Sequence, residues 1–89
     1  MQTGVVEAVL DGETFRLNTG ETVRLAEVDV PEVGSPAYAQ AFEKLKQLVE
    51  GKAILYDQRT IDGYGQIVAD VWVNSLYINN EMHRFISLL

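Results

Sequence analysis

The sequence has 89 residues, no cysteine and a formal net charge of −6. A chain this short forms a single domain, 1–89, with one shared core, and without cysteine it has neither disulfides nor thiolate zinc sites to stabilise it. Hydrophobic residues make up 47% of the chain and charged residues 22%, which excludes a disordered chain, and the negative charge disfavours non-specific binding of nucleic acid.

The first third of the chain is predicted to form three short strands. Alternating apolar residues indicate a first strand over 4–10. A second strand over 14–17 turns back at Gly20, because glycine suits a hairpin turn, and a third strand follows over 22–28. Three short strands need further cover to be stable, so the rest of the chain must supply it.

A helix is predicted after the proline that ends the sheet pattern. Ser35 is placed to cap this helix, Pro36 lies in its first turn, where a missing N–H costs nothing, and Gly51 lies at its end. Apolar residues recur in it at intervals of three and four, which indicates a stripe that faces the core. The stripe consists of Tyr38, Ala41, Phe42, Leu45, Leu48 and Val49.

Two further strands and a closing helix complete the predicted fold. The strands span 53–59 and 66–73 and are joined by a glycine-rich turn, 62–65. A short extended piece over 76–78 leads into a helix that Asn79 is placed to cap. The predicted fold class is therefore mainly β (α+β): a five-stranded OB-type barrel with a helix between strands three and four and a short C-terminal helix.

Acidic residues gather at the predicted strand ends. In such a barrel the ends of adjacent strands bring Glu13 and Asp29 together, with Glu32 nearby. Three carboxylates at one rim repel one another unless a cation or an arginine compensates, and Arg24 lies on the same strand. Carboxylates also suit calcium, but solvated turn residues and a surface charged for solubility explain the same pattern. The residues alone leave these alternatives open.

Five motifs, taken in order, resemble the thermonuclease, or staphylococcal nuclease-like, family. They are Asp11-Gly12-Glu13-Thr14, Val23-Arg24-Leu25, Asp29-Val30-Pro31-Glu32, Asp62-Gly63-Tyr64-Gly65 and Ile78-Asn79-Asn80-Glu81. The resemblance runs in register over almost the whole chain, and its strongest segment, VRLAEVDVPE, is close to the family pattern V-R-L-x-G-I-D-A/T-P-E.

The resemblance implies calcium-dependent hydrolysis of phosphodiester bonds in DNA and RNA. It implies that Glu13, Asp29 and the carbonyl oxygen of Val30 are calcium ligands. The implied partner is single-stranded DNA or RNA, whose binding the acidic surface weakens.

The same resemblance implies the roles of three more side chains. Arg24 is expected to be a catalytic, phosphate-binding residue, and Glu32 the catalytic carboxylate that acts as general base or orients the attacking water. Tyr64 is expected to contact the nucleotide as a substrate-binding residue.

Two departures from the family pattern weaken this expectation. Gln66 stands where the family has its second catalytic arginine, and Gly63 replaces a basic residue. Loss of one such electrostatic donor costs about 3 kcal/mol or more of transition-state stabilisation. Three functions therefore stay open: a weak calcium-dependent nuclease, a catalytically inactive barrel that serves as a binding or interaction module, and a domain that binds calcium without catalysis.

Three further side chains are expected to have no role in a site. His83 has no second nitrogen ligand and is expected at the surface, Arg59 is expected to be a solvated strand-end residue, and Trp72 is expected to pack in the core. No apolar run approaches the roughly 18 residues of a membrane span, and no basic segment followed by an apolar stretch begins the chain. We expect no membrane association. The compartment stays open, with the cytoplasm favoured, because a chain trimmed of a leader would look the same. The oligomeric state is left open.

Overall fold

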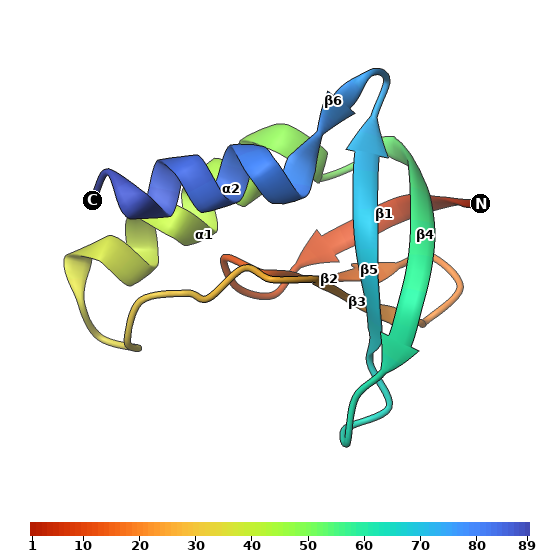
Figure 1. The fold of residues 1–89 in the computed structure, drawn as a ribbon, viewed down its shortest axis with the longest axis horizontal. Coiled ribbons are helices and arrows are strands. Elements are labelled where there is room, and N and C mark those ends of the chain that lie inside the picture. Colours follow the sequence, from red (N-terminus) through yellow and green to blue (C-terminus); the bar gives the residue numbers. More distant parts are fainter.

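The computed structural model describes residues 1–89 and contains six strands and two helices (Figure 1). In chain order these are β1 (Gln2–Val9), β2 (Thr14–Leu17), β3 (Thr22–Leu25), α1 (Pro36–Val49), β4 (Ala53–Ile61), β5 (Ile67–Val73), β6 (Leu76–Tyr77) and α2 (Ile78–Ser87). The strands form one sheet in the order β3-β2-β1-β4-β5-β6, and an additional pairing of β3 with β5 closes a barrel of five strands. The predicted fold class is confirmed.

Closure of the barrel brings β3 next to β5. These two strands pair in parallel, with Arg24 opposite Val68 in the register. All other neighbouring strands are antiparallel. The closing pair therefore places Arg24 near the turn between β4 and β5, which is far from it in the sequence.

The core lies inside the barrel and under the two helices, which run side by side over one end of it (Figure 1). Eighteen buried hydrophobic residues form a single cluster. The predicted stripe of α1 is confirmed, because Ala41, Leu45 and Val49 are fully buried. From α2, Ile78 and Met82 fill the same cluster. Neither helix is long and apolar enough to cross a membrane.

The predicted start of α1 is confirmed, whereas that of α2 is wrong. Ser35 caps α1, with its Oγ accepting a hydrogen bond from the N–H of Tyr38 at 3.1 Å. In α2 the residue before the helix, Tyr77, makes no side-chain capping bond. Asn79 lies one residue inside the helix and is buried, so its amide bonds to the barrel rather than to the end of its own helix.

The structure differs from two further expectations, the end of the third strand and the position of Trp72. The third strand ends at Leu25 and not at residue 28, because Glu27 has a φ of 61°, which lies outside the range of a strand. Trp72 does not pack in the core. It is half-buried on the outer side of β5 and stacks on Tyr77, with 5.3 Å between the ring centroids.

Candidate functional site

A pocket of about 440 Å³ opens at the rim of the barrel, where the loop after β1, the strand β3 and the turn between β4 and β5 meet. We call it the rim pocket. Three of its lining residues were predicted from the sequence: Glu13, Arg24 and Tyr64. The complete lining is Asp11, Glu13, Thr14, Arg24, Asp62, Tyr64 and Gln66.

Local hydrogen bonds present Glu13 to Arg24. The carboxylate of Asp11 accepts a hydrogen bond from the N–H of Glu13 at 2.8 Å, which forms a turn just before β2. The carbonyl of Glu13 accepts the N–H of Leu25 at 2.7 Å, and this bond ties the turn to β3. Because Thr14 pairs with Arg24 across β2 and β3, the side chains of Glu13 and Arg24 meet at the rim.

Arg24 lies between two carboxylates. Its Nη1 is 3.7 Å from Oε2 of Glu13, and its Nε is 3.6 Å from Oδ2 of Asp62. Both distances exceed the usual length of a hydrogen bond. Glu13 Oε2 and Arg24 Nε are buried and have no hydrogen-bond partner. Buried polar atoms are rarely left in this state. Oε2 of Glu13 is suited to bind a cation or a hydrogen-bond donor, and the Nε–H of Arg24 is suited to donate to an anionic acceptor.

The ionisation of Glu13 is unfavourable in this setting. Burial raises the pKa of Glu13, and the charge of Asp11 raises it further. Arg24 opposes this rise, and Asp29 adds to it. Asp29 therefore lies close enough to act on Glu13, although it does not line the rim pocket. A cation near Glu13 would offset the burial and the repulsion together.

The three other predicted residues lie in the loop between β3 and α1. Asp29 and Glu32 are exposed, and Val30 is half-buried. The carbonyl of Glu32 accepts hydrogen bonds from the N–H and the Oγ of Ser35, at 3.1 and 2.7 Å, so its backbone is fixed at the start of α1. Val30 packs on Gly12, since a Cβ added to Gly12 would lie 2.9 Å from Val30 Cγ1.

The expected convergence of three carboxylates is not found. No group of three acidic or histidine side chains lies close enough to hold a metal ion. The calcium ligands implied by the resemblance need only two carboxylates, Glu13 and Asp29, with the carbonyl of Val30. Calcium takes six to eight oxygen ligands, and water or substrate commonly supplies part of them. The unpartnered, buried carboxylate oxygen of Glu13 fits such a hard cation.

Sequence reasoning assigned no role to Asp62. This residue opens the turn between β4 and β5, and its Oδ1 accepts the N–H groups of Tyr64 and Gln66, both at 2.9 Å. An aspartate that begins a glycine-rich turn is a known signal for this arrangement. Tyr64 itself is 91% exposed, which leaves its ring free at the edge of the rim pocket.

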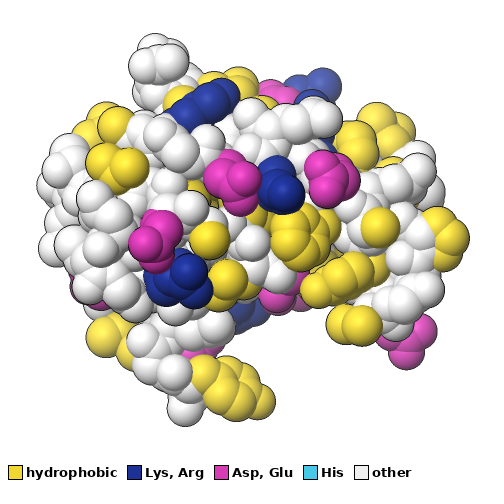
Figure 2. All heavy atoms as spheres, turned by 180° about the vertical axis from the view of Figure 1, so that it is seen from behind, with side chains coloured by type: hydrophobic (Ala, Val, Ile, Leu, Met, Phe, Trp, Pro, Cys, Tyr) yellow, Lys and Arg dark blue, Asp and Glu magenta, His cyan; other side chains and the backbone are white.

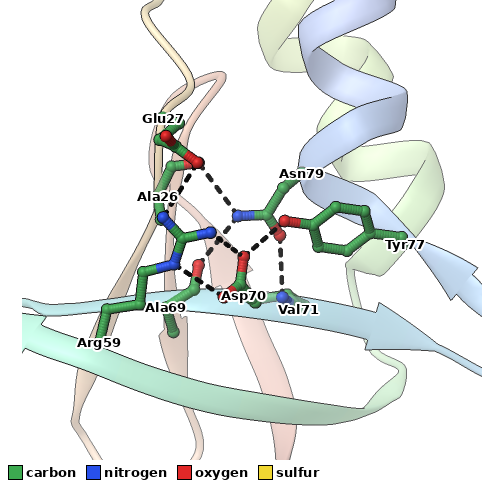
Figure 3. Close-up of polar contacts among 8 residues, drawn as sticks. All are labelled: Ala26, Glu27, Arg59, Ala69, Asp70, Val71, Tyr77 and Asn79. Carbon is green, nitrogen blue, oxygen red and sulfur yellow. Dashed lines mark hydrogen bonds and ion pairs between the residues drawn. The ribbon is translucent and has the colours of Figure 1, made fainter.

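A second polar cluster lies on the outside of the barrel (Figure 3). Arg59 donates to both carboxylate oxygens of Asp70, each at 2.8 Å, and to Glu27 at 2.9 Å. The hydroxyl of Tyr77 donates to Asp70 at 2.5 Å. These four residues form what we call the ion-pair cluster. Arg59 is exposed, as expected, but β4 continues beyond it to Ile61, and its guanidinium is already occupied and is not free for phosphate.

The ion-pair cluster shifts the ionisation of its members. The hydrogen bond from Arg59 lowers the pKa of Asp70, and that from Tyr77 lowers it further. The same bond to Asp70 raises the pKa of Tyr77.

His83 is exposed, as predicted, and lines a separate pocket of about 290 Å³ in which it is the only histidine.

The face of the molecule seen in Figure 2 carries no basic stripe. Lysine and arginine side chains lie there singly, next to acidic ones and between hydrophobic patches. Non-specific binding of nucleic acid relies on clustered basic residues. This face therefore offers no general attraction for a nucleic acid backbone.

Comparison with known proteins points to one family. The sequence profile described as staphylococcal nuclease homologue matches residues 22–84. Protein ParB of Escherichia coli is 31% identical over 74 residues, which cover 80% of this chain and 42% of ParB. Staphylococcal-like nuclease CAN1 of Arabidopsis thaliana is 33% identical over 60 residues, which cover 67% of this chain and 19% of the plant protein. The probable staphylococcal-like nuclease CAN1 of Oryza sativa subsp. japonica is 32% identical over 63 residues, or 18% of its length. The chain thus spans less than half the length of these relatives.

Proposed function

Because the chain belongs to the staphylococcal nuclease homologue family, we propose that it is a nuclease-like domain that hydrolyses phosphodiester bonds of single-stranded DNA or RNA with calcium. The observation that carries this proposal is the arrangement of Arg24 beside Glu13 in the rim pocket. A guanidinium and an unpartnered carboxylate oxygen lie together there, as an anionic substrate and a cation require.

The proposed roles are those that the family resemblance implies, and each suits the chemistry of its side chain. Arg24 binds a phosphoryl oxygen, and Tyr64, exposed at the edge of the rim pocket, contacts a base or sugar of the substrate. Glu32 orients the attacking water or accepts its proton. Calcium, held by Glu13, Asp29 and the Val30 carbonyl, supplies positive charge for the phosphoryl oxygens.

The proposed activity is weak, because the turn between β4 and β5 carries no cation. Gln66 lines the rim pocket, and its amide has no charge to offset that of a phosphoryl oxygen. Loss of one positioned donor lowers kcat by about 10²- to 10³-fold in enzymes that use such donors. The acidic net charge weakens substrate binding further, chiefly because it removes the long-range attraction between the protein and a nucleic acid.

A second candidate function is a catalytically inactive binding or interaction module. It is favoured by the setting of Arg24, which faces two carboxylates and no second cation in the rim pocket. This charge balance disfavours binding of a phosphate at Arg24, as is expected of a module without catalysis.

Cleavage of single-stranded DNA and of RNA, measured at low salt with and without calcium, tests the proposal. Low salt is needed because screening would hide a weak electrostatic contribution. We expect slow, calcium-dependent cleavage that Glu32→Gln and Asp29→Ala abolish. Glu43→Gln, an equal change of charge at an exposed position of α1, serves as the matched control and should leave cleavage unchanged.

The outcomes separate the candidates. Cleavage that persists in Asp29→Ala or without calcium would contradict the proposed mechanism. No cleavage, together with a calcium-dependent rise in Tm that Asp29→Ala removes, would identify a calcium-binding domain without catalysis. No cleavage and no effect of calcium on Tm would leave the inactive module.

A further inference from the structure

The rim pocket holds three carboxylates and a single guanidinium. Asp11, Glu13 and Asp62 line it together with Arg24, and its remaining lining residues are uncharged. The charge of Arg24 is therefore more than balanced before any substrate arrives. A phosphate that approaches Arg24 must come close to carboxylates that repel it, and such repulsion is strong at short range in a partly buried site.

The two oxygens of Asp62 have different neighbours. Oδ1 accepts the N–H groups of Tyr64 and Gln66 and so shapes the turn between β4 and β5. Oδ2 lies 3.6 Å from Nε of Arg24, an atom that has no hydrogen-bond partner. One side chain thus connects the shape of the turn to the position of the arginine. With an exposed fraction of only 18%, the side chain of Asp62 is also held in place by its surroundings.

We propose that Asp62 is a positioning residue that holds Arg24 in the rim pocket and withholds it from phosphate groups until a cation balances the local negative charge. The inference rests on the proposed function, since it specifies how the same site admits its substrate. Asp62 thereby makes phosphate binding depend on the cation. An acidic domain with a single arginine in its site then does not bind nucleic acid when calcium is absent.

Removal of the charge of Asp62, without removal of its hydrogen-bond acceptor, tests this inference. In Asp62→Asn the side-chain oxygen can still accept the N–H groups of Tyr64 and Gln66. Thymidine monophosphate is a suitable probe, because it has no phosphodiester bond to be cleaved. Its binding is followed by proton–nitrogen NMR of the Nε–H of Arg24 and of the backbone amide of Glu13.

Without calcium, we expect Asp62→Asn to bind thymidine monophosphate about three- to tenfold more tightly than the wild type, as removal of one nearby charge implies. Saturating calcium should tighten binding to the wild type and have a smaller effect on Asp62→Asn. Glu43→Gln, which changes the net charge equally at a distant site, should bind as the wild type does.

A second variant separates positioning from folding. Asp62→Ala removes the acceptor as well as the charge, so the amides of Tyr64 and Gln66 should lose protection against hydrogen exchange, whereas Asp62→Asn should keep it. Equal affinities in the wild type and Asp62→Asn, or an equal gain in Glu43→Gln, would overturn the inference. Because this readout needs no cleavage, failure of the nuclease proposal is recognised separately, by the cleavage assay.

Discussion

The side-chain amide of Asn79, in the first turn of α2, donates a hydrogen bond to the carbonyl oxygen of Ala26, which lies 53 residues earlier, at 3.1 Å (Figure 3). The same amide donates to the carbonyl of Ala69 at 2.9 Å, and its oxygen accepts the N–H of Val71 at 2.8 Å. Asn79 is only 4% exposed. One buried side chain thus joins α2, β5 and the loop that leads from β3 toward Asp29.

Replacement of Asn79 should therefore destabilise the whole domain. Asn79→Ala leaves backbone groups of Ala26 and Val71 buried without these partners, and we expect a loss of about 2 to 4 kcal/mol in the free energy of unfolding. Urea denaturation measures this loss. Asn80→Ala, at the exposed neighbouring position, should change the free energy of unfolding by less than about 0.5 kcal/mol. Equal effects of the two substitutions would contradict the prediction.

Glu27 has a φ of 61°, a conformation that suits glycine. It stands where the family pattern has a glycine, and its carboxylate binds Arg59. Glu27→Ala removes the ion pair and keeps the unfavourable backbone, whereas Glu27→Gly removes both. We expect the glycine variant to be more stable than the alanine variant by about 1 kcal/mol, as measured by urea denaturation. The reverse order would show that the backbone at this position is not strained.

The pKa of Asp70 is lowered by Arg59, so its contribution to stability should depend on pH. A carboxyl group whose pKa is lower in the folded than in the unfolded state stabilises the fold above its unfolded value, here about 3.8, and loses this effect as the pH falls through the folded value. Asp70→Asn should therefore lower Tm at pH 7, and this difference from the wild type should shrink as the pH falls below about 3.8. A difference that stays constant from pH 7 to pH 2 would rule out this linkage.

Gly12 lies where the loop after β1 contacts both α1 and Val30. An added Cβ would lie 2.8 Å from the Cβ of Ala41 and 2.9 Å from Cγ1 of Val30. Gly12→Ala should destabilise the domain by about 1 to 3 kcal/mol, as overpacking does. It should also weaken the proposed calcium binding, because the loop that carries Val30 is displaced. Thermal unfolding with and without calcium measures both effects. Gly63→Ala, where the added Cβ meets no atom within 4 Å, is the control.

Gln66→Arg adds a cation to the turn between β4 and β5, where the resemblance implies a second catalytic arginine. We expect calcium-dependent cleavage of single-stranded DNA to rise by about 10²-fold or more, since a positioned donor of this kind contributes about that factor. Gln47→Arg makes the same chemical change at an exposed position of α1 and should not raise cleavage comparably. No gain in Gln66→Arg would favour the inactive module over the weak nuclease.

Local signals in the sequence were sufficient to predict most of the fold. Ser35 and Pro36 mark the start of α1, and alternating apolar residues mark β1 and β5, because capping and periodicity depend on neighbouring residues alone. The errors have a common cause. The end of β3 before Glu27, the outward position of Trp72 and the buried position of Asn79 all depend on segments that are distant in the sequence.

For the candidate site, the motifs identified Glu13, Arg24 and Tyr64, which the rim pocket brings together. The sequence could not reveal that Asp62 lies beside Arg24, because that contact exists only when β3 pairs with β5 and closes the barrel.

The sequence by itself thus determined the family, the order of the strands and helices, and the residue types available for chemistry. Only the tertiary structure decided which charges meet. Electrostatic interactions and hydrogen bonds depend on distance and burial, and these arise when strands that are far apart in the chain pack around one core.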